Sequence, residues 1–158
     1  MSGNNRLIDI TLDEASLAAA SADAEHERKI AIFDLLEANV FAIEGVDDGP
    51  YALRLSIHDG RLVLDAARAS DGVSVRALVL SLAAFRRLIR DYFLICDSYH
   101  QAIRYATPSQ IEAIDMGRRG LHNEGSELLT QRLAGKFNID FDTARRLFTL
   151  ICALHVRP

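Results

Sequence analysis

The chain has 158 residues, room for one domain and little else, so we expect residues 1–158 to form a single domain. Apolar residues make up 49% of it and charged residues 25%, a balance that excludes a disordered chain and a small disulfide-held scaffold. The net charge of −4 argues against a uniformly basic surface for nucleic acid.

The sequence contains no recognisable signal for export or for insertion into a membrane. The N-terminal MSGNNRLIDITLDE carries acidic residues and lacks the apolar segment of a signal peptide. Charged residues interrupt each apolar run well before the roughly 20 residues that a membrane span needs. The two cysteines, Cys96 and Cys152, lie in apolar runs, as reduced core thiols do. We therefore expect a cytoplasmic protein that has no contact with a membrane.

The first half of the chain reads as strands with one helix. Alternating apolar residues predict a strand over 6–12, and a helix follows over 23–39, in which Phe33, Leu36 and Val40 share a face. Turn formers fill 44–50 and recur at Asp59-Gly60 and at 70–72. Between these turns the pattern predicts three strands that form an antiparallel meander: 51–58, a strand through Leu62 and Leu64, and 73–80.

The second half reads as three helices. An apolar stripe predicts a long, central helix over 82–106. Thr107, Pro108 and Gln110 form a capping box with proline in the first turn, so the next helix begins at about 108 and runs towards 134. Asp140 or Asp142 caps a last helix with a buried stripe of Ala144, Leu147, Phe148, Ile151 and Leu154. The predicted class is α+β, a small antiparallel sheet (the meander plus the N-terminal strand) packed against about four helices.

The helix from residue 108 carries ionisable side chains where its own periodicity predicts hydrocarbon. On a helical wheel Arg118 falls near the middle of the apolar arc and His122 towards its edge, with Asp115 and Ser126 just beyond. A guanidinium that faces inward needs a carboxylate or a bound anion, because burying an unpaired charge is costly. The arc itself is defined by six aliphatic residues: Ile111, Ile114, Leu121, Leu128, Leu129 and Leu133.

Three glycines, Gly117, Gly120 and Gly125, lie in the same turns. Glycine costs about 1 kcal/mol relative to alanine inside a helix, so three of them within two or three turns need a reason. Either another helix packs very close, or the helix breaks and RRGLHNEG becomes a loop that presents its polar groups.

The leading hypothesis is a non-enzymatic binding or regulatory domain. Arg118, Arg119, His122, Asn123 and Glu124, with Asp115 beside them, would recognise a protein partner or a small anionic ligand through guanidinium and backbone N–H groups.

Two alternatives use the same residues differently. In a small hydrolase-like enzyme, His122 would be the acid or base, and Asp115 or Glu124 would orient it. In a purely structural arrangement, Arg118 and Asp115 would form a buried ion pair that locks the helices together.

Other polar clusters are weaker signals. Asp97, His100 and Arg104 lie near one another on the 82–106 helix and are secondary candidates. Neither a His-x-x-x-His pair nor a Cys-x-x-Cys pair is present, so we expect no metal, and the absence of nucleotide-binding fingerprints predicts no cofactor. Nucleic acid is an unlikely partner, because the aromatic residues fall on core stripes rather than between the cations that we expect on solvated helix faces: Arg86, Arg87, Arg90, Arg145 and Arg146.

Several segments together resemble one bacterial family. They are RLIDITLDE, EHERKIAIFDLLEAN, GPYALRLSIHDGRLVLD, TPSQIEAIDMGRRGLHNEGSELL and IDFDTARRLFTLICALH, of which AIDMGRRGLHNEG is the most specific. The chain is similar over nearly its whole length to the uncharacterised alphaproteobacterial family numbered 262 in the UPF series. The resemblance implies a cytoplasmic bacterial protein, and it brings no activity, cofactor or catalytic residue with it.

Overall fold

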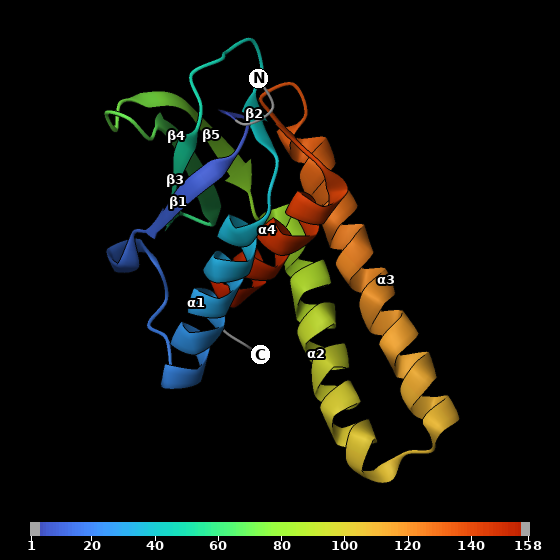
Figure 1. The fold of residues 1–158 in the computed structure, drawn as a ribbon. Helices are drawn as coiled ribbons and strands as arrows, with labels where there is room; N and C mark the ends of the chain where they lie inside the picture. The colour runs from blue at the N-terminus through green and yellow to red at the C-terminus, as the bar shows by residue number, and fades with distance from the viewer. Residues whose placement is uncertain (1–3, 156–158) are drawn as a thin grey trace.

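Alternating apolar residues on consecutive strands build the main sheet. In the computed structural model, which describes residues 4–155, β3 (Tyr51–His58), β4 (Arg61–Arg68) and β5 (Ser74–Ser81) form the predicted antiparallel meander (Figure 1). The N-terminal strand β1 (Leu7–Leu12) joins them, but it pairs with β3 in the parallel sense, so the sheet is mixed, with the order β1-β3-β4-β5. The long connection between β1 and β3 allows this pairing, because a parallel neighbour requires a crossover.

Two strands of three residues each were not predicted. β2 (Phe41–Ile43) and β6 (Phe137–Ile139) pair in the antiparallel sense as a separate small sheet. Phe41, Ile43 and Phe137 are fully buried or nearly so. Segments this short carry too little periodicity to be recognised before the fold places them beside each other.

The helices agree closely with the sequence, and the α+β class is confirmed. They are α1 (Ala22–Glu37), α2 (Ala83–Tyr105), α3 (Pro108–Leu133) and α4 (Phe141–Ala153), with a short 3-10 helix, η2 (Glu14–Ser16). The capping box forms: Gln110 N donates to Thr107 Oγ1 at 3.3 Å, and Thr107 N donates to Gln110 Oε1 at 3.0 Å. Asp140 caps α4 by accepting from Thr143 N at 2.9 Å. Within residues 4–155, no helix is both long and apolar enough to cross a membrane.

The core lies between the main sheet and the helices. The predicted apolar stripe of α4 is buried along its whole length, from Ala144 to Leu154. On α1 the buried face is not the one that Phe33 defines, because Phe33 is 66% exposed and Ala31 and Leu35 are buried instead. Buried Arg28 supports this orientation, since its Nε donates to Ala153 O at 3.0 Å and so satisfies a carbonyl at the C-terminal end of α4.

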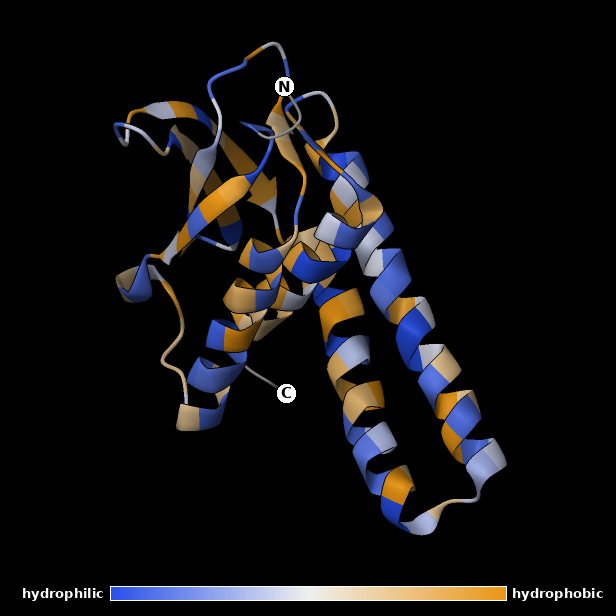
Figure 2. Ribbon diagram, in the orientation of Figure 1, coloured by the Kyte–Doolittle hydropathy of each residue, from blue (hydrophilic) through white to orange (hydrophobic). Residues whose placement is uncertain are grey.

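The helix α2 is only half central. Its first half, with Phe85, Ile89 and Phe93, packs into the core, whereas its second half projects from the body beside the first half of α3 (Figure 1). Beyond Phe93, Ala102 is the single buried residue of α2, a helix that the structure describes throughout. Figure 2 accordingly shows polar and apolar residues mixed along this projection. We call residues 94–117 the arm.

The glycines of α3 mark close helix packing, and the helix does not break. A Cβ at Gly117 would lie 2.8 Å from Ile95 Cδ1 of α2, and a Cβ at Gly125 would overlap the ring of Phe148 on α4. Gly120 faces open space. Two of the three glycines therefore let neighbouring helices approach the bare backbone.

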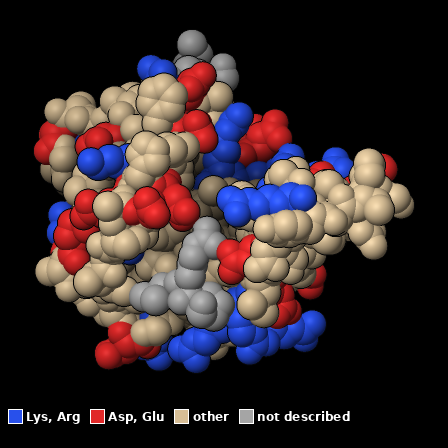
Figure 3. Space-filling view, turned by 90° about the horizontal axis from the view of Figure 1, so that it is seen from below, with Lys and Arg blue, Asp and Glu red and all other residues tan. Residues whose placement is uncertain are grey.

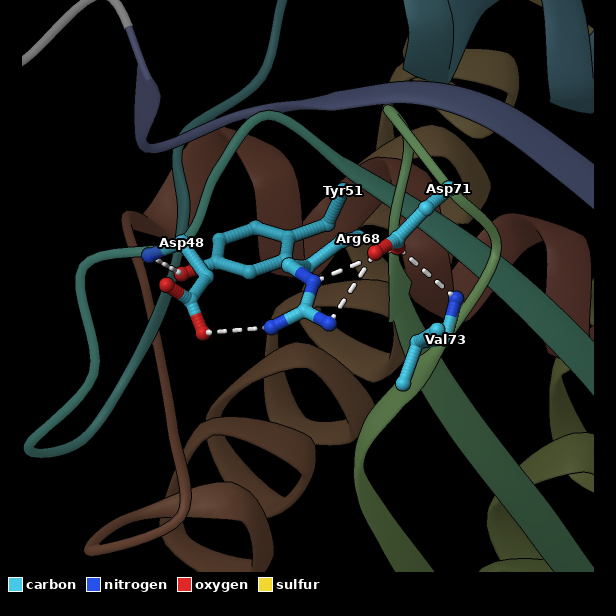
Figure 4. A network of polar contacts seen from close by, with 5 residues as sticks. All are labelled: Asp48, Tyr51, Arg68, Asp71 and Val73. Carbon is cyan, nitrogen blue, oxygen red and sulfur yellow. Dashed lines mark hydrogen bonds and ion pairs between the residues drawn. The ribbon is translucent and has the colours of Figure 1, made fainter.

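Arg68 connects the 44–50 and 69–72 turns at one edge of the meander (Figure 4). Its guanidinium lies 3.6 Å from a carboxylate oxygen of Asp48 and donates to Asp71 at 3.0 and 3.2 Å. Asp48 N donates to Tyr51 Oη at 3.2 Å, and Val73 N donates to Asp71 at 3.0 Å. Tyr51 is buried, whereas Asp48 and Asp71 are exposed and Arg68 is half-buried. The network joins the 44–50 and 69–72 turns and lies away from the helices that hold the candidate residues, so its role is structural.

Alanine substitutions at the two contrasting glycines test this packing. Gly120→Ala should raise the free energy of unfolding by about 0.5–1 kcal/mol, because it improves helix propensity in open space. Gly125→Ala should lower it by about 1–3 kcal/mol, because Phe148 must move. Urea unfolding followed by circular dichroism measures both. Equal effects at the two positions would contradict the packing described here.

Candidate functional site

A pocket of about 440 Å3 opens between α3 and α4. Two arginines from each helix line it: Arg118 and Arg119 from α3, and Arg145 and Arg146 from α4. Its remaining lining residues are Tyr92, His122, Thr149 and Asp142. We call it the arginine pocket. On α4, Asp142, Arg146 and Thr149 are spaced by four and three residues, and Arg145 lies beside Arg146, so one face of that helix forms one wall.

The four guanidinium groups are held in different ways. Asp115 serves both arginines of α3: Arg118 Nε donates to it at 3.2 Å, and Arg119 Nε lies 3.2 Å from its other oxygen. Arg146 donates to Ala38 O at 2.9 Å. Arg145 has no ion-pair partner within residues 4–155. Three guanidinium groups thus share one carboxylate and one carbonyl, whereas the guanidinium of Arg145 has neither among the residues that the structure describes.

Arg118 also joins the two helices of the arm. Its guanidinium carbon lies 4.2 Å from the centre of the Tyr99 ring of α2, which is cation–π geometry. Burial works against its charge, but the hydrogen bond and the charge of Asp115 outweigh this and raise the pKa of Arg118. The Arg118 side chain is 34% exposed and that of Asp115 is 25% exposed. This pair is half-buried and lies on one helix, so the cation–π contact, rather than the ion pair, reaches across to α2.

His122 forms the inner wall of the arginine pocket. Only 9% of it is exposed, and its ring packs 5.4 Å from the ring centres of both Tyr92 and Phe148. Its Nε2 lies 2.8 Å from Thr149 Oγ1, and that hydroxyl donates its own hydrogen to Arg145 O at 3.0 Å. Thr149 must therefore accept at His122, which places the imidazole hydrogen on Nε2. Nδ1 is left as a buried acceptor that has no hydrogen-bond partner among residues 4–155.

The surroundings of His122 keep it neutral. Burial, then the charges of Arg145 and Arg118, lower its pKa from 6.5 to about 4. The imidazole therefore adds no positive charge at neutral pH, and the arginines carry the charge of the pocket. Burial also raises the pKa of Tyr92, so this ring lines the pocket as an uncharged phenol.

The structure brings together only some of the residues singled out in the sequence. Arg118, Arg119 and His122 line the pocket, and Asp115 lies behind them as the partner of both arginines. Asn123 and Glu124 are exposed and lie outside the pocket lining.

The secondary candidates form a separate surface on the arm. Asp97, His100 and Arg104 line a shallow hollow of about 360 Å3 on α2, together with Gln101 and Tyr105. The described part of the chain contains no group of three histidine, cysteine or acidic residues that could hold a metal ion. This surface is open and is not joined to the arginine pocket by any shared lining residue.

Sequence reasoning placed Arg145 and Arg146 on solvated helix faces and missed their part in the pocket. Arg145 is indeed exposed, yet both residues face the cations of α3 across the pocket. A signal was present, because Asp142, Arg145, Arg146 and Thr149 share one polar face of a helix whose opposite face is apolar. Which helix would lie opposite that face was not readable from the sequence.

Fold and pocket together define an α+β protein with a cationic hollow between two packed helices. The chain belongs to the uncharacterised protein family UPF0262, which it matches over residues 4–157. It is 64% identical to a UPF0262 protein of Phenylobacterium zucineum and 63% identical to one of Hyphomonas neptunium, in each case over 97% of this chain and 94% of the relative. A UPF0262 protein of Agrobacterium fabrum is 57% identical over 99% of this chain and 98% of its own length. No solved structure matches the chain.

The lowered pKa of His122 has a measurable consequence for stability. Between pH 6.5 and about 4 the unfolded chain binds a proton at His122 that the folded chain does not, so the free energy of unfolding falls as the pH falls. This contribution is up to ~3 kcal/mol. His122→Gln should remove it and make stability less dependent on pH in this range, as measured by urea unfolding at several pH values.

The exposed His26 of α1 provides the matched control. His26→Gln should keep the pH dependence of the wild-type protein. If His122→Gln kept it too, the folded protein would not lower the pKa of His122.

Proposed function

We propose that this protein is a non-enzymatic binding or regulatory domain that holds an anionic ligand, such as a phosphate or carboxylate group, in the arginine pocket. The observation that carries the proposal is that four arginine residues, two from each of two helices, line one hollow. Arginine presents its donors in a planar fork that matches both of these anions, which is why it predominates in such sites.

Local electrostatics support an anion in this place. Asp142 is the single carboxylate among the lining residues that the structure describes, against four guanidinium groups. Arg145 and Arg146 lie in the second turn of α4, near the positive end of its dipole. Like charges held this close repel one another, so a bound anion would stabilise the arrangement.

Acid–base catalysis by His122 has weaker support from the geometry. Its pKa of about 4 makes it a poor proton acceptor at neutral pH. The carboxylates considered as its orienting partner are otherwise placed: Asp115 binds the arginines, and Glu124 is exposed and outside the pocket lining. Thr149 holds the imidazole instead. A histidine fixed in this way is suited to shaping a pocket.

Titration with phosphate, sulfate and a nucleotide tests the proposal, followed by thermal shift and calorimetry. Binding to the folded state should raise the melting temperature with ligand concentration. Arg145→Gln should weaken binding about tenfold, because it removes one charge-assisted contact. Added salt should weaken binding as well, since the pocket is open to solvent.

Arg132→Gln is the matched control, because Arg132 is exposed on α3 outside the pocket and its loss changes the net charge equally. This variant should bind like the wild-type protein. If both substitutions weakened anion binding equally, the attraction would be due to diffuse charge. If no anion raised the melting temperature, the proposal that the arginine pocket binds an anion would be refuted.

A further inference from the structure

A second hollow lies next to the arginine pocket. It has a volume of about 240 Å3 and lies between α1 and α2, with α4 at its base. Tyr92 and Thr149 line both hollows, so the two meet at these residues. Thr149 is exposed and Tyr92 is half-buried, and the junction therefore lies at the surface.

The second hollow has the opposite character to the arginine pocket. No arginine or lysine of the described chain lines it. Its walls are mainly apolar: Ile30 and Ala31 of α1, Phe93 and Cys96 of α2, and Cys152 and Ala153 of α4, with His100 of α2 as the one imidazole among the lining residues that the structure describes. We call it the apolar cleft. Two carboxylates, Glu27 and Asp34, lie at its exposed rim on α1, and Figure 3 shows acidic side chains on the part of the body that faces the arm.

One face of α4 runs through both hollows. Arg145 and Arg146 line the first, Thr149 lies at the junction, and Ala153 lines the second. Arg145, Thr149 and Ala153 are spaced by four residues, and Arg146 lies beside Arg145, so these positions follow one another along the helix. The span from Arg145 to Ala153 is about 12 Å at a rise of 1.5 Å per residue. Charge thus gives way to hydrocarbon along one continuous track.

From this track we propose that the ligand is a single-chain anionic amphiphile, such as a fatty acid or an alkyl phosphate. Its head binds in the arginine pocket, and its chain crosses Thr149 into the apolar cleft. This inference rests on the proposed function, since it assigns the head to the same arginines. The rim carboxylates add a constraint, because they disfavour a second anionic group in the cleft and orient the head towards the arginines.

Chain length provides the test. Calorimetry compares inorganic phosphate, butyl phosphate and octyl phosphate, each below the concentration at which it forms micelles. We expect affinity to rise with chain length, by up to about fourfold for each methylene group that reaches the cleft. Arg145→Gln should weaken binding of all three probes, because all three share the head group.

A matched pair of variants on α1 isolates the cleft. Ile30 is 47% exposed and lines the cleft, whereas Phe33 is 66% exposed on the same helix and lies outside it. Ile30→Asn should reduce the gain with chain length and leave phosphate binding unchanged, and Phe33→Asn should change neither. Both residues are substantially exposed, so both variants should fold, which circular dichroism verifies.

The outcomes separate the two proposals. If phosphate bound but affinity did not rise with alkyl chain length, the proposal of an amphiphilic ligand would be overturned, and the proposal of an anion-binding pocket would stand. No binding of any probe would overturn both. A last experiment compares free octyl phosphate with phosphatidylcholine vesicles that also contain anionic phosphatidic acid. The protein could instead bind the vesicles equally well with Ile30→Asn and fail to bind free octyl phosphate. That result would indicate attachment to a membrane surface and would overturn the proposal that the apolar cleft binds an alkyl chain.

Discussion

The contact between the Phe148 ring and the bare backbone at Gly125 sets the distance between α3 and α4, and the arginine pocket depends on it. Because no side chain separates the helices there, His122 meets the edge of the same ring, and the guanidinium groups of α3 and α4 face one another across the pocket. A wider spacing would separate the arginine pairs and expose the imidazole. The glycine that costs helix propensity is therefore part of what gathers the charges.

Gathering four guanidinium groups is unfavourable, and the protein offsets it locally. Asp115 neutralises part of the charge on α3. The guanidinium of Arg118 makes a cation–π contact with the Tyr99 ring, and that of Arg146 donates a hydrogen bond to the backbone carbonyl of Ala38. His122 is neutral at neutral pH, because a positive charge on its imidazole would be both desolvated and repelled by the arginines. The electrostatics of the pocket thus explain why its histidine contributes shape and the arginines contribute charge.

Much of the fold could be predicted because its signals are local. The box of Thr107 and Gln110, the cap at Asp140 and the turn at Asp59-Gly60 fix where elements begin and end. The pocket could be only half predicted, since Arg118 and His122 break the pattern of their own helix, whereas Arg145 obeys the pattern of α4 and becomes notable only opposite α3. The arm illustrates the same limit: Ile103 continues the apolar stripe of α2 but is 55% exposed, because no other element within residues 4–155 covers it.

The division of α4 into a charged and an apolar half also bears on affinity. Guanidinium groups beside open water gain little from a single anion, because solvent and salt screen the attraction. An apolar cleft of about 240 Å3 likewise gains little from an uncharged fragment that has nothing to fix its orientation. A ligand that engages both halves loses its overall freedom once and makes both sets of contacts. On these physical grounds the adjacency of the two hollows, rather than either hollow alone, is the reason we propose a binding site on this face of the protein.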